Sequence, residues 1–172
     1  MLRRARDLAP LSTHQDIAEA VCHFQSRRFE IVRDRLGART SELPAEARFY
    51  LALAEIFDGD TALAAAVAAG WEDDPSRSPS LAFARGEIEA RLGRPEFARA
   101  LLASGHTATH FATATLALSV GDDRQATREL SRSIEAQELD QTWIRTDIRL
   151  DGIRNTAAFE RLADRALETA ER

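Results

Sequence analysis

The feature that most constrains the fold is a glycine that recurs between helix-like segments and is followed, five positions later, by a small residue. Gly59, Gly93 and Gly121 are 34 and 28 residues apart and share this pattern. A weaker copy surrounds Arg27, which lies 32 residues before Gly59 and has Val32 in the place of the small residue. A period of this length is typical of repeat proteins, in which each unit packs against its neighbours. We therefore predict four helix-turn-helix units.

Helix start signals agree with these turns. Pro44 can open one helix, and Ser78 with Pro79 can open another, because a serine N-cap and a first-turn proline both suit a helix N-terminus. The patterning predicts helices over residues 14–26, 29–38, 45–58, 60–70, 79–92, 95–104, 107–119 and 122–137. No segment alternates like a strand, and we interpret 71–79 as a connection between helix pairs rather than as a domain boundary.

Composition is consistent with a helical protein. Of the 172 residues, 44% are hydrophobic and 30% are charged, with only 8 Gly and 5 Pro, which disfavours both a disordered chain and a many-turned β-sandwich. The net charge of -5 disfavours broad binding to nucleic-acid phosphates. All 23 basic residues are arginine, which we interpret as the bias of a GC-rich bacterial genome.

The sequence also predicts a location in the cell. Cys22 is the single cysteine, so an internal disulfide is excluded, and we expect its side chain to be buried in a helix. No stretch has the apolar core of a signal peptide or the length of a membrane-spanning helix. We therefore expect a cytoplasmic protein that does not contact a membrane.

These residues resemble the tetratricopeptide repeat (TPR) family. The turn pairs Gly59-Asp60 and Gly121-Asp122, the alanines five residues after the turn glycines, and the small Gly86 are similar to residues that this family uses at its turns and close helix contacts. The resemblance spans most of residues 14–137. It implies an α-solenoid of antiparallel helix pairs with an inner groove.

The C-terminal stretch is similar to a closing segment found in many bacterial TPR arrays, in which a final helix caps the solenoid. The residues that carry this resemblance are Asp147, Leu150, Ile153, Arg154, Phe159 and Leu162. The last repeat of an array exposes an apolar face that a terminal element must cover. We expect Ile153, Phe159, Leu162 and Ala166 to lie on the covering face. We also expect Asn155 to cap the final helix and Gly152 to let the chain turn into it.

Little in the sequence indicates catalysis or metal binding. His106 and His110 are four residues apart, but no third ligand lies nearby and the glutamate of a zincin motif is missing. There is no phosphate loop, nucleophile elbow or Cys-His arrangement. We expect no metal, no cofactor and no enzymatic activity.

A recurring large apolar residue is the first candidate for partner binding. Ile17, Phe49, Phe83 and Phe111 each lie ten residues before a turn position, and Leu53 follows Phe49 by one helical turn. In TPR arrays this place resembles one that faces the groove, where the row would form a trough for a helix or an extended peptide. The alternative is that these side chains are ordinary core.

A row of arginines is the second candidate. Arg124, Arg128 and Arg132 are spaced at i, i+4 and i+8, so they project along one side of one helix. The row is either a solvated face, partly neutralised by neighbouring glutamates, or a contact for an acidic partner.

Together these patterns predict an all-α protein: a solenoid of about four degenerate TPR-like hairpins in a single domain, residues 1–172, with repeats over 12–137 and a cap over 138–172. We predict a non-catalytic interaction module or scaffold that binds a protein or peptide rather than nucleic acid, and a homo-oligomer remains open. One alternative is a regulatory module that binds a small ligand or signalling peptide, and a less favoured one is a hydrolase that uses His106 or His110.

Overall fold

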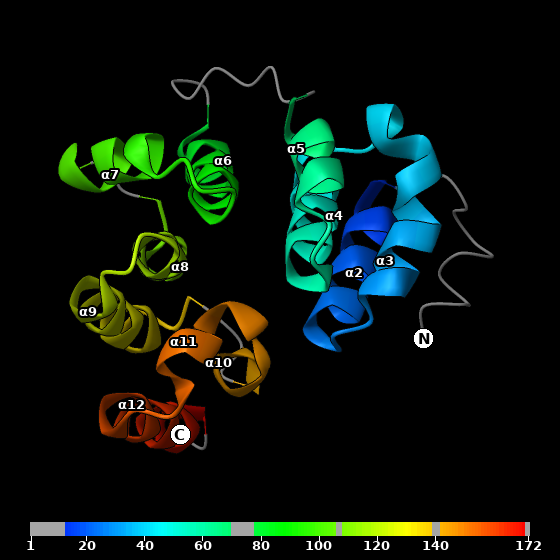
Figure 1. Ribbon diagram of the computed structural model, residues 1–172. Coiled ribbons are helices and arrows are strands. Elements are labelled where there is room, and N and C mark those ends of the chain that lie inside the picture. Colours follow the sequence, from blue (N-terminus) through cyan, green and yellow to red (C-terminus); the bar gives the residue numbers. More distant parts are fainter. Residues whose placement is uncertain (1–12, 70–77, 106–107, 139–141, 171–172) are drawn as a thin grey trace. The chain divides into compact units, whose positions relative to one another are not determined.

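All regular structure in the described part of the chain is helical, so the all-α prediction is confirmed for those residues. The computed structural model describes residues 13–69, 78–105, 108–138 and 142–170, and none of them lies in a strand. The chain forms two compact units, Met1–Glu72 and Asp73–Arg172, and each is described by itself (Figure 1). The division falls inside segment 71–79, most of which lies outside the described residues.

The first unit contains two helix pairs. Its elements are α2 (Thr13–Gln25), α3 (Phe29–Leu36), the 3-10 helix η1 (Gly37–Glu42), α4 (Ala45–Asp58) and α5 (Thr61–Ala69). Helices α2 and α3 pack against each other and against α4, and α4 packs against α5. Phe24 is fully buried at the centre, and its ring contacts those of Phe29, Tyr50 and Phe57. An aromatic core therefore joins the two pairs.

The second unit contains two more helix pairs and a C-terminal segment. Its elements are α6 (Pro79–Arg91), α7 (Glu96–Ala103), α8 (His110–Ser119), α9 (Asp123–Glu135), α10 (Thr142–Thr146), the 3-10 helix η2 (Ile148–Leu150), α11 (Asp151–Arg154) and α12 (Ala157–Ala170). Helix α8 packs against α6, α7, α9 and η2, and α12 packs against α9 (Figure 1). Helix α8 is thus the centre of the unit.

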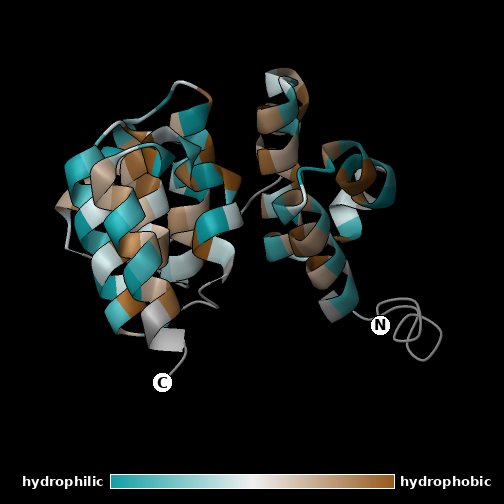
Figure 2. Cartoon of the chain, turned by 90° about the horizontal axis from the view of Figure 1, so that it is seen from below, coloured by the Kyte–Doolittle hydropathy of each residue, from teal (hydrophilic) through white to brown (hydrophobic). Residues whose placement is uncertain are grey.

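Hydrophobic and hydrophilic residues are both present along the helices (Figure 2), and α7, α9 and α12 are clearly amphipathic. Their hydrophobic faces supply the core, as expected for helices of a globular protein. No helix among the described residues is long and apolar enough to span a membrane.

The four turns that the sequence predicts share one backbone geometry. Gly59, Gly93 and Gly121 have φ angles of 97°, 84° and 81°, and Arg27 adopts the same left-handed region at 56°. In each turn the residue after the one with positive φ donates its backbone N–H to the carbonyl five residues earlier, at 2.8 to 2.9 Å. This is the hydrogen bond of a Schellman motif, which ends a helix. Glycine suits three of these places because it adopts positive φ without steric cost.

Small residues around these turns are buried, as the repeat pattern requires. Val32 is 1% exposed and Ala64, Ala98 and Ala126 are fully buried. A Cβ atom added to Gly86 would lie 3.1 Å from side-chain carbons of Leu101 and Leu116, on α7 and α8. The small residues therefore let neighbouring helices approach closely.

The C-terminal segment shares a core with α8 and α9. Ile153, Phe159, Leu162 and Ala166, which the sequence places on one face, are all at most 4% exposed. They form one cluster with residues of α8 and α9, namely Phe111, Ala114, Leu130 and Ile134. The last helix pair is therefore covered on this side.

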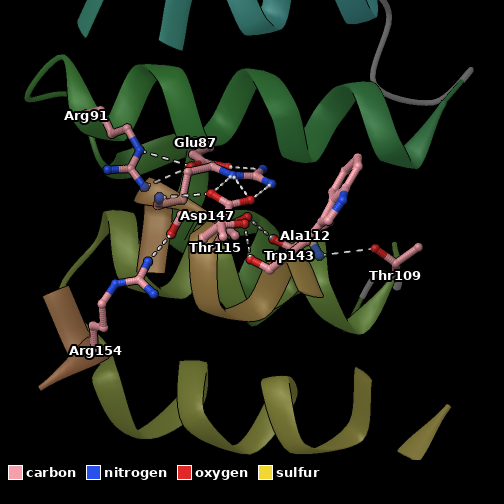
Figure 3. Close-up of polar contacts among 10 residues, drawn as sticks. Glu87, Arg91, Thr109, Ala112, Thr115, Trp143, Asp147 and Arg154 are labelled. Atoms are coloured by element: carbon pink, nitrogen blue, oxygen red, sulfur yellow. Dashed lines mark hydrogen bonds and ion pairs between the residues drawn. The ribbon is translucent and has the colours of Figure 1, made fainter. Parts of the chain in front are cut away.

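A buried ionic cluster also holds this segment (Figure 3). Asp147 is fully buried, and its carboxylate accepts hydrogen bonds from the Arg149 side chain, the shortest at 2.6 Å from Nη2. The Arg149 guanidinium lies 4.9 Å from the Phe111 ring centroid on α8, and its Nη1 is 3.7 Å from Oε2 of Glu87 on α6. Glu87, 2% exposed, also accepts from Arg91 Nε at 3.0 Å. The cluster thus joins η2 to both α6 and α8.

Arg154 completes the attachment of the segment. Its Nη2 donates to the carbonyl of Asp147 at 2.7 Å, and its Nη1 donates to the carbonyl of Arg145. The guanidinium also lies 5.6 Å from the Phe159 ring centroid. One side chain therefore satisfies two backbone carbonyls and contacts α12, which fixes the path of the chain between α10 and α12.

Several local predictions were wrong or displaced. Gly152 has no positive φ and lies inside α11 rather than at a turn. Asn155 does not cap α12, because Thr156 Oγ1 accepts the Phe159 N–H at 3.2 Å in its place. Helix α8 begins at His110 instead of residue 107, because Thr109 is its N-cap and Glu138 accepts the N–H groups of its first two residues at 2.9 and 3.0 Å.

The two kinds of glycine in the second unit predict opposite effects of alanine. Gly121→Ala should lower the free energy of unfolding by about 1 kcal/mol, because its φ of 81° disfavours a Cβ atom. Gly152→Ala, in helical backbone with no atom within 4 Å of the added Cβ, should be neutral or stabilising by up to about 1 kcal/mol. Urea denaturation of the two variants checks this, and equal effects would contradict it.

Removing the centre of the ionic cluster should be costly. Arg149→Ala leaves the Asp147 carboxylate buried without its guanidinium and removes one of the two arginines beside Glu87, so the second unit should lose about 3 to 5 kcal/mol of unfolding free energy. The control is Arg145→Ala, which removes an exposed ion pair with Asp164 and should cost at most about 1 kcal/mol. A denaturation midpoint of Arg149→Ala close to that of the control would show that the cluster contributes little.

Candidate functional site: an arginine-lined groove

A groove of about 510 Å³ runs between α9 and α12 in the second unit. Five arginines and one glutamate line it, together with small or apolar residues of both helices. The charged residues are Arg124, Arg128, Arg132, Glu135, Arg161 and Arg165. Positive charges therefore outnumber negative ones in the lining, and the groove is a candidate surface for a negatively charged ligand.

Helix geometry explains why these arginines converge. Arg124, Arg128 and Arg132 follow one another at i+4 intervals on α9, and Arg161 and Arg165 do so on α12. The opposite face of each helix is apolar: Leu130 and Ala163 are buried in the shared core. Burial of those faces turns the two arginine rows toward one groove, with Leu162 and Ala158 among its lining residues.

Some of these arginines are engaged within the protein. Glu129, 7% exposed, accepts from Arg132 Nη1 at 2.9 Å, and Arg128 Nε lies 3.6 Å from the same oxygen. Arg165 Nη1 lies 3.3 Å from Glu135 Oε1 and donates to Ser131. These contacts hold the guanidinium groups in place and neutralise part of their charge.

The other two arginines have no carboxylate partner among the described residues. Arg124 and Arg161 are exposed, and neither has an ion pair or side-chain hydrogen bond with any residue that the structure describes. Guanidinium groups bind carboxylates and phosphates in bidentate geometry. The groove can therefore bind an anionic group at these two side chains while the remaining arginines add to the local positive potential.

A second hollow adjoins the groove. It has a volume of about 690 Å³ and lies between the end of α7 and the start of α9. Leu102 and Ala103 on α7 and Val120 before α9 supply its apolar lining. Arg124 lines both this hollow and the groove, so the two adjoin at that residue.

The first unit has a hollow of its own, of about 350 Å³, lined by apolar residues and an ion pair. Arg33 donates to the fully buried Glu55 at 2.6 Å and to Asp58 at 2.6 Å. These hydrogen bonds, the one with Glu55 first, raise the pKa of Arg33 above its ordinary value. The guanidinium is therefore always charged and already engaged by two carboxylates.

The proposed apolar trough does not form. Leu53 is fully buried, and Phe49, Phe83 and Phe111 are 8%, 2% and 6% exposed, while Ile17 on α2 is half-buried. Phe83 packs with Leu116 and Ala98, and Phe111 packs with residues of the C-terminal segment. In the second unit these phenylalanines therefore pack against elements that follow in the chain. They are ordinary core residues, which was the alternative to a groove.

The other candidate residues are not brought together with metal ligands in the described part of the chain. His106 lies outside the described residues, and in the described part of the chain no three His, Cys, Asp or Glu side chains are grouped to hold a metal. His110 Nδ1 lies 2.9 Å from Glu129 Oε2, but this pair lines neither the groove nor the adjoining hollow. Cys22 is exposed, contrary to expectation, because it lies on the outer face of α2.

The sequence pattern predicts only one side of the groove, the arginine row on α9. Arg161 and Arg165, which form the other side, follow 29 or more residues later and were not among the predicted residues. Their i+4 spacing on the final helix is a detectable signal, but the packing of α12 on α9 is needed to bring the rows together. The ionic cluster was missed for the same reason, since Glu87 and Arg149 are 62 residues apart.

Comparisons with protein-family models, curated proteins and solved structures find no match for this chain. The groove is therefore interpreted from its own residues.

Burial of the phenylalanine row has a measurable consequence. Phe83→Ala should cost about 3 to 5 kcal/mol and destabilise the second unit, because the ring is only 2% exposed. Leu167→Ala is the matched control, since Leu167 is 43% exposed on α12 and its loss should change the stability by about 0.5 kcal/mol or less. Urea denaturation, monitored by circular dichroism, checks both variants. A Phe83→Ala variant as stable as the unmodified protein would contradict a core role for Phe83 and favour the trough.

Proposed function

We propose that this protein is a non-catalytic interaction module that binds an acidic segment of a partner protein in the groove between α9 and α12. The observation that carries the proposal is the inversion of charge: five arginines and one glutamate line the groove of a chain whose net charge is -5. Complementary charge increases the rate of association and disfavours wrong partners.

Protein is favoured over nucleic acid as the partner. Binding to a phosphate backbone usually draws on an extended basic surface, whereas here 28 acidic residues outnumber the 23 arginines. Five arginines are gathered in a groove of about 510 Å³, a size that suits a short acidic segment.

The proposed architecture is a TPR-like α-solenoid, with four helix pairs and residues 138–172 as its cap. The four equivalent turns and the buried small residues beside them support this reading. In such an array the end of the solenoid is closed by a terminal element with a polar outer face. Here that element also supplies one wall of the groove.

The two rival functions have weaker support. The hollow of the first unit would suit a small ligand, but Arg33, the basic residue that lines it, is already bound by Glu55 and Asp58. A hydrolase would need a nucleophile beside His110, and Glu129 is the ring's only side-chain partner among the residues described.

The test is the binding of an acidic peptide. A fluorescent hexaglutamate peptide should bind the full chain at low ionic strength, and fluorescence anisotropy measures its affinity. Arg124→Glu combined with Arg161→Glu should weaken binding at least about tenfold, because the two cations proposed to contact the peptide become anions that repel it. Raising the salt concentration should also weaken it.

The control for this experiment carries the same change of net charge elsewhere. Arg94→Glu with Arg145→Glu alters two exposed arginines of the second unit that do not line the groove. This variant should retain nearly full affinity. Equal losses in the two double variants would show that net charge, rather than the groove, attracts the peptide. Tighter binding of a single-stranded oligonucleotide at the same salt concentration would overturn the choice of a protein partner.

A further inference from the structure

We infer that the partner segment carries an apolar anchor residue beside its acidic run, and that this residue occupies the hollow between α7 and α9. This inference rests on the proposed function of the groove and specifies what the segment must contain. Its evidence is that the two depressions share one lining residue and differ in the charge of their linings.

The two depressions adjoin at Arg124. This exposed side chain lines the groove on one side and the hollow of about 690 Å³ on the other. A segment whose carboxylates bind Arg124 and Arg161 therefore reaches the hollow with its next residues. The hollow is also large enough for a leucine or phenylalanine side chain.

The linings of the two depressions differ in charge. The rim of the hollow carries Arg99 and Arg124 but also Asp122 and Asp123, so its charges balance, whereas the groove is strongly positive. Asp122 is already used as the N-cap of α9, where it accepts the Gln125 N–H at 2.8 Å. A further carboxylate would be repelled by the two aspartates and gains little from the hollow.

Apolar surface is what remains for a ligand to cover. Leu102 and Val120 are half-buried against the core of α6 to α8, and Ala103 is exposed at the end of α7. An apolar side chain placed on them removes the remaining surface from water. The hollow therefore favours a leucine-like residue over a polar one.

The length of the groove sets the spacing within the segment. Arg124 and Glu135 are eleven residues apart on α9, which corresponds to roughly 16 Å at the rise of an α-helix. An extended peptide covers this distance with about five residues. The segment is thus about five acidic positions followed or preceded by the anchor.

The experiment compares four synthetic peptides against the full chain by fluorescence anisotropy. Two peptides contain five glutamates and one leucine, which is at the N-terminus of one peptide and at the C-terminus of the other. The two matched peptides have glycine in place of the leucine. One leucine peptide should bind roughly tenfold more tightly than its glycine counterpart, because part of the leucine surface is buried. The better orientation identifies the direction of the segment.

A variant that fills the hollow localises the effect. Ala103→Phe places a ring in the hollow without removing any core side chain, so it should abolish the leucine advantage and leave the affinity for the glycine peptides unchanged. Ala136→Phe is the control: this alanine is also exposed but does not line the hollow, so the advantage should persist.

The possible outcomes separate this inference from the proposed function. Equal binding of the leucine and glycine peptides, or a leucine advantage that survives Ala103→Phe, overturns the anchor while the acidic groove stands. Absence of binding by all four peptides overturns both. A dimer of the free protein that the Arg124→Glu and Arg161→Glu pair dissociates, measured by sedimentation, would assign the groove to a second copy and also overturn the inference.

Discussion

The second unit depends on the burial of one arginine between two carboxylates. Arg149 lies against Asp147 in its own segment and near Glu87 on α6, and its guanidinium covers Phe111 of α8. Buried charges are tolerated only when they are paired, so this arrangement permits one placement of η2 on the helices before it. The position of α11 and α12 follows, since Arg154 holds the intervening backbone and Phe159 enters the core.

Placement of α12 has a functional consequence, because the groove exists only between α12 and α9. Helix α9 alone would present three arginines to solvent, two of them close to Glu129. Helix α12 adds Arg161 and Arg165 and closes the depression. The same element thus covers the apolar face of the last helix pair and forms half of the proposed binding surface. Stability and recognition are coupled here, so variants that loosen the ionic cluster should be avoided when binding is measured.

The distribution of charge matters more than its total. A net charge of -5 describes the chain as a whole, yet five arginines line the groove, two of them with no ion pair to any described residue, and they create a positive surface that the total conceals. Carboxylates such as Glu129 and Glu135 neutralise the arginines nearest to them. What remains unneutralised is therefore localised at Arg124 and Arg161, and this localisation favours a short acidic segment over an extended polyanion.

The sequence by itself determined the helices and their turns, since these depend on neighbours a few residues away. Positive φ at Gly59 and Gly121, the small residues five positions later and the covering face of α12 all follow from local spacing. Tertiary structure alone decided which faces became surface. The phenylalanine pattern fits both a groove and a core, and packing of each ring on the next element made Phe83 and Phe111 core. Likewise, Arg161 meets the α9 row only because burial of both apolar faces against a common core orients two helices that sequence spacing cannot relate.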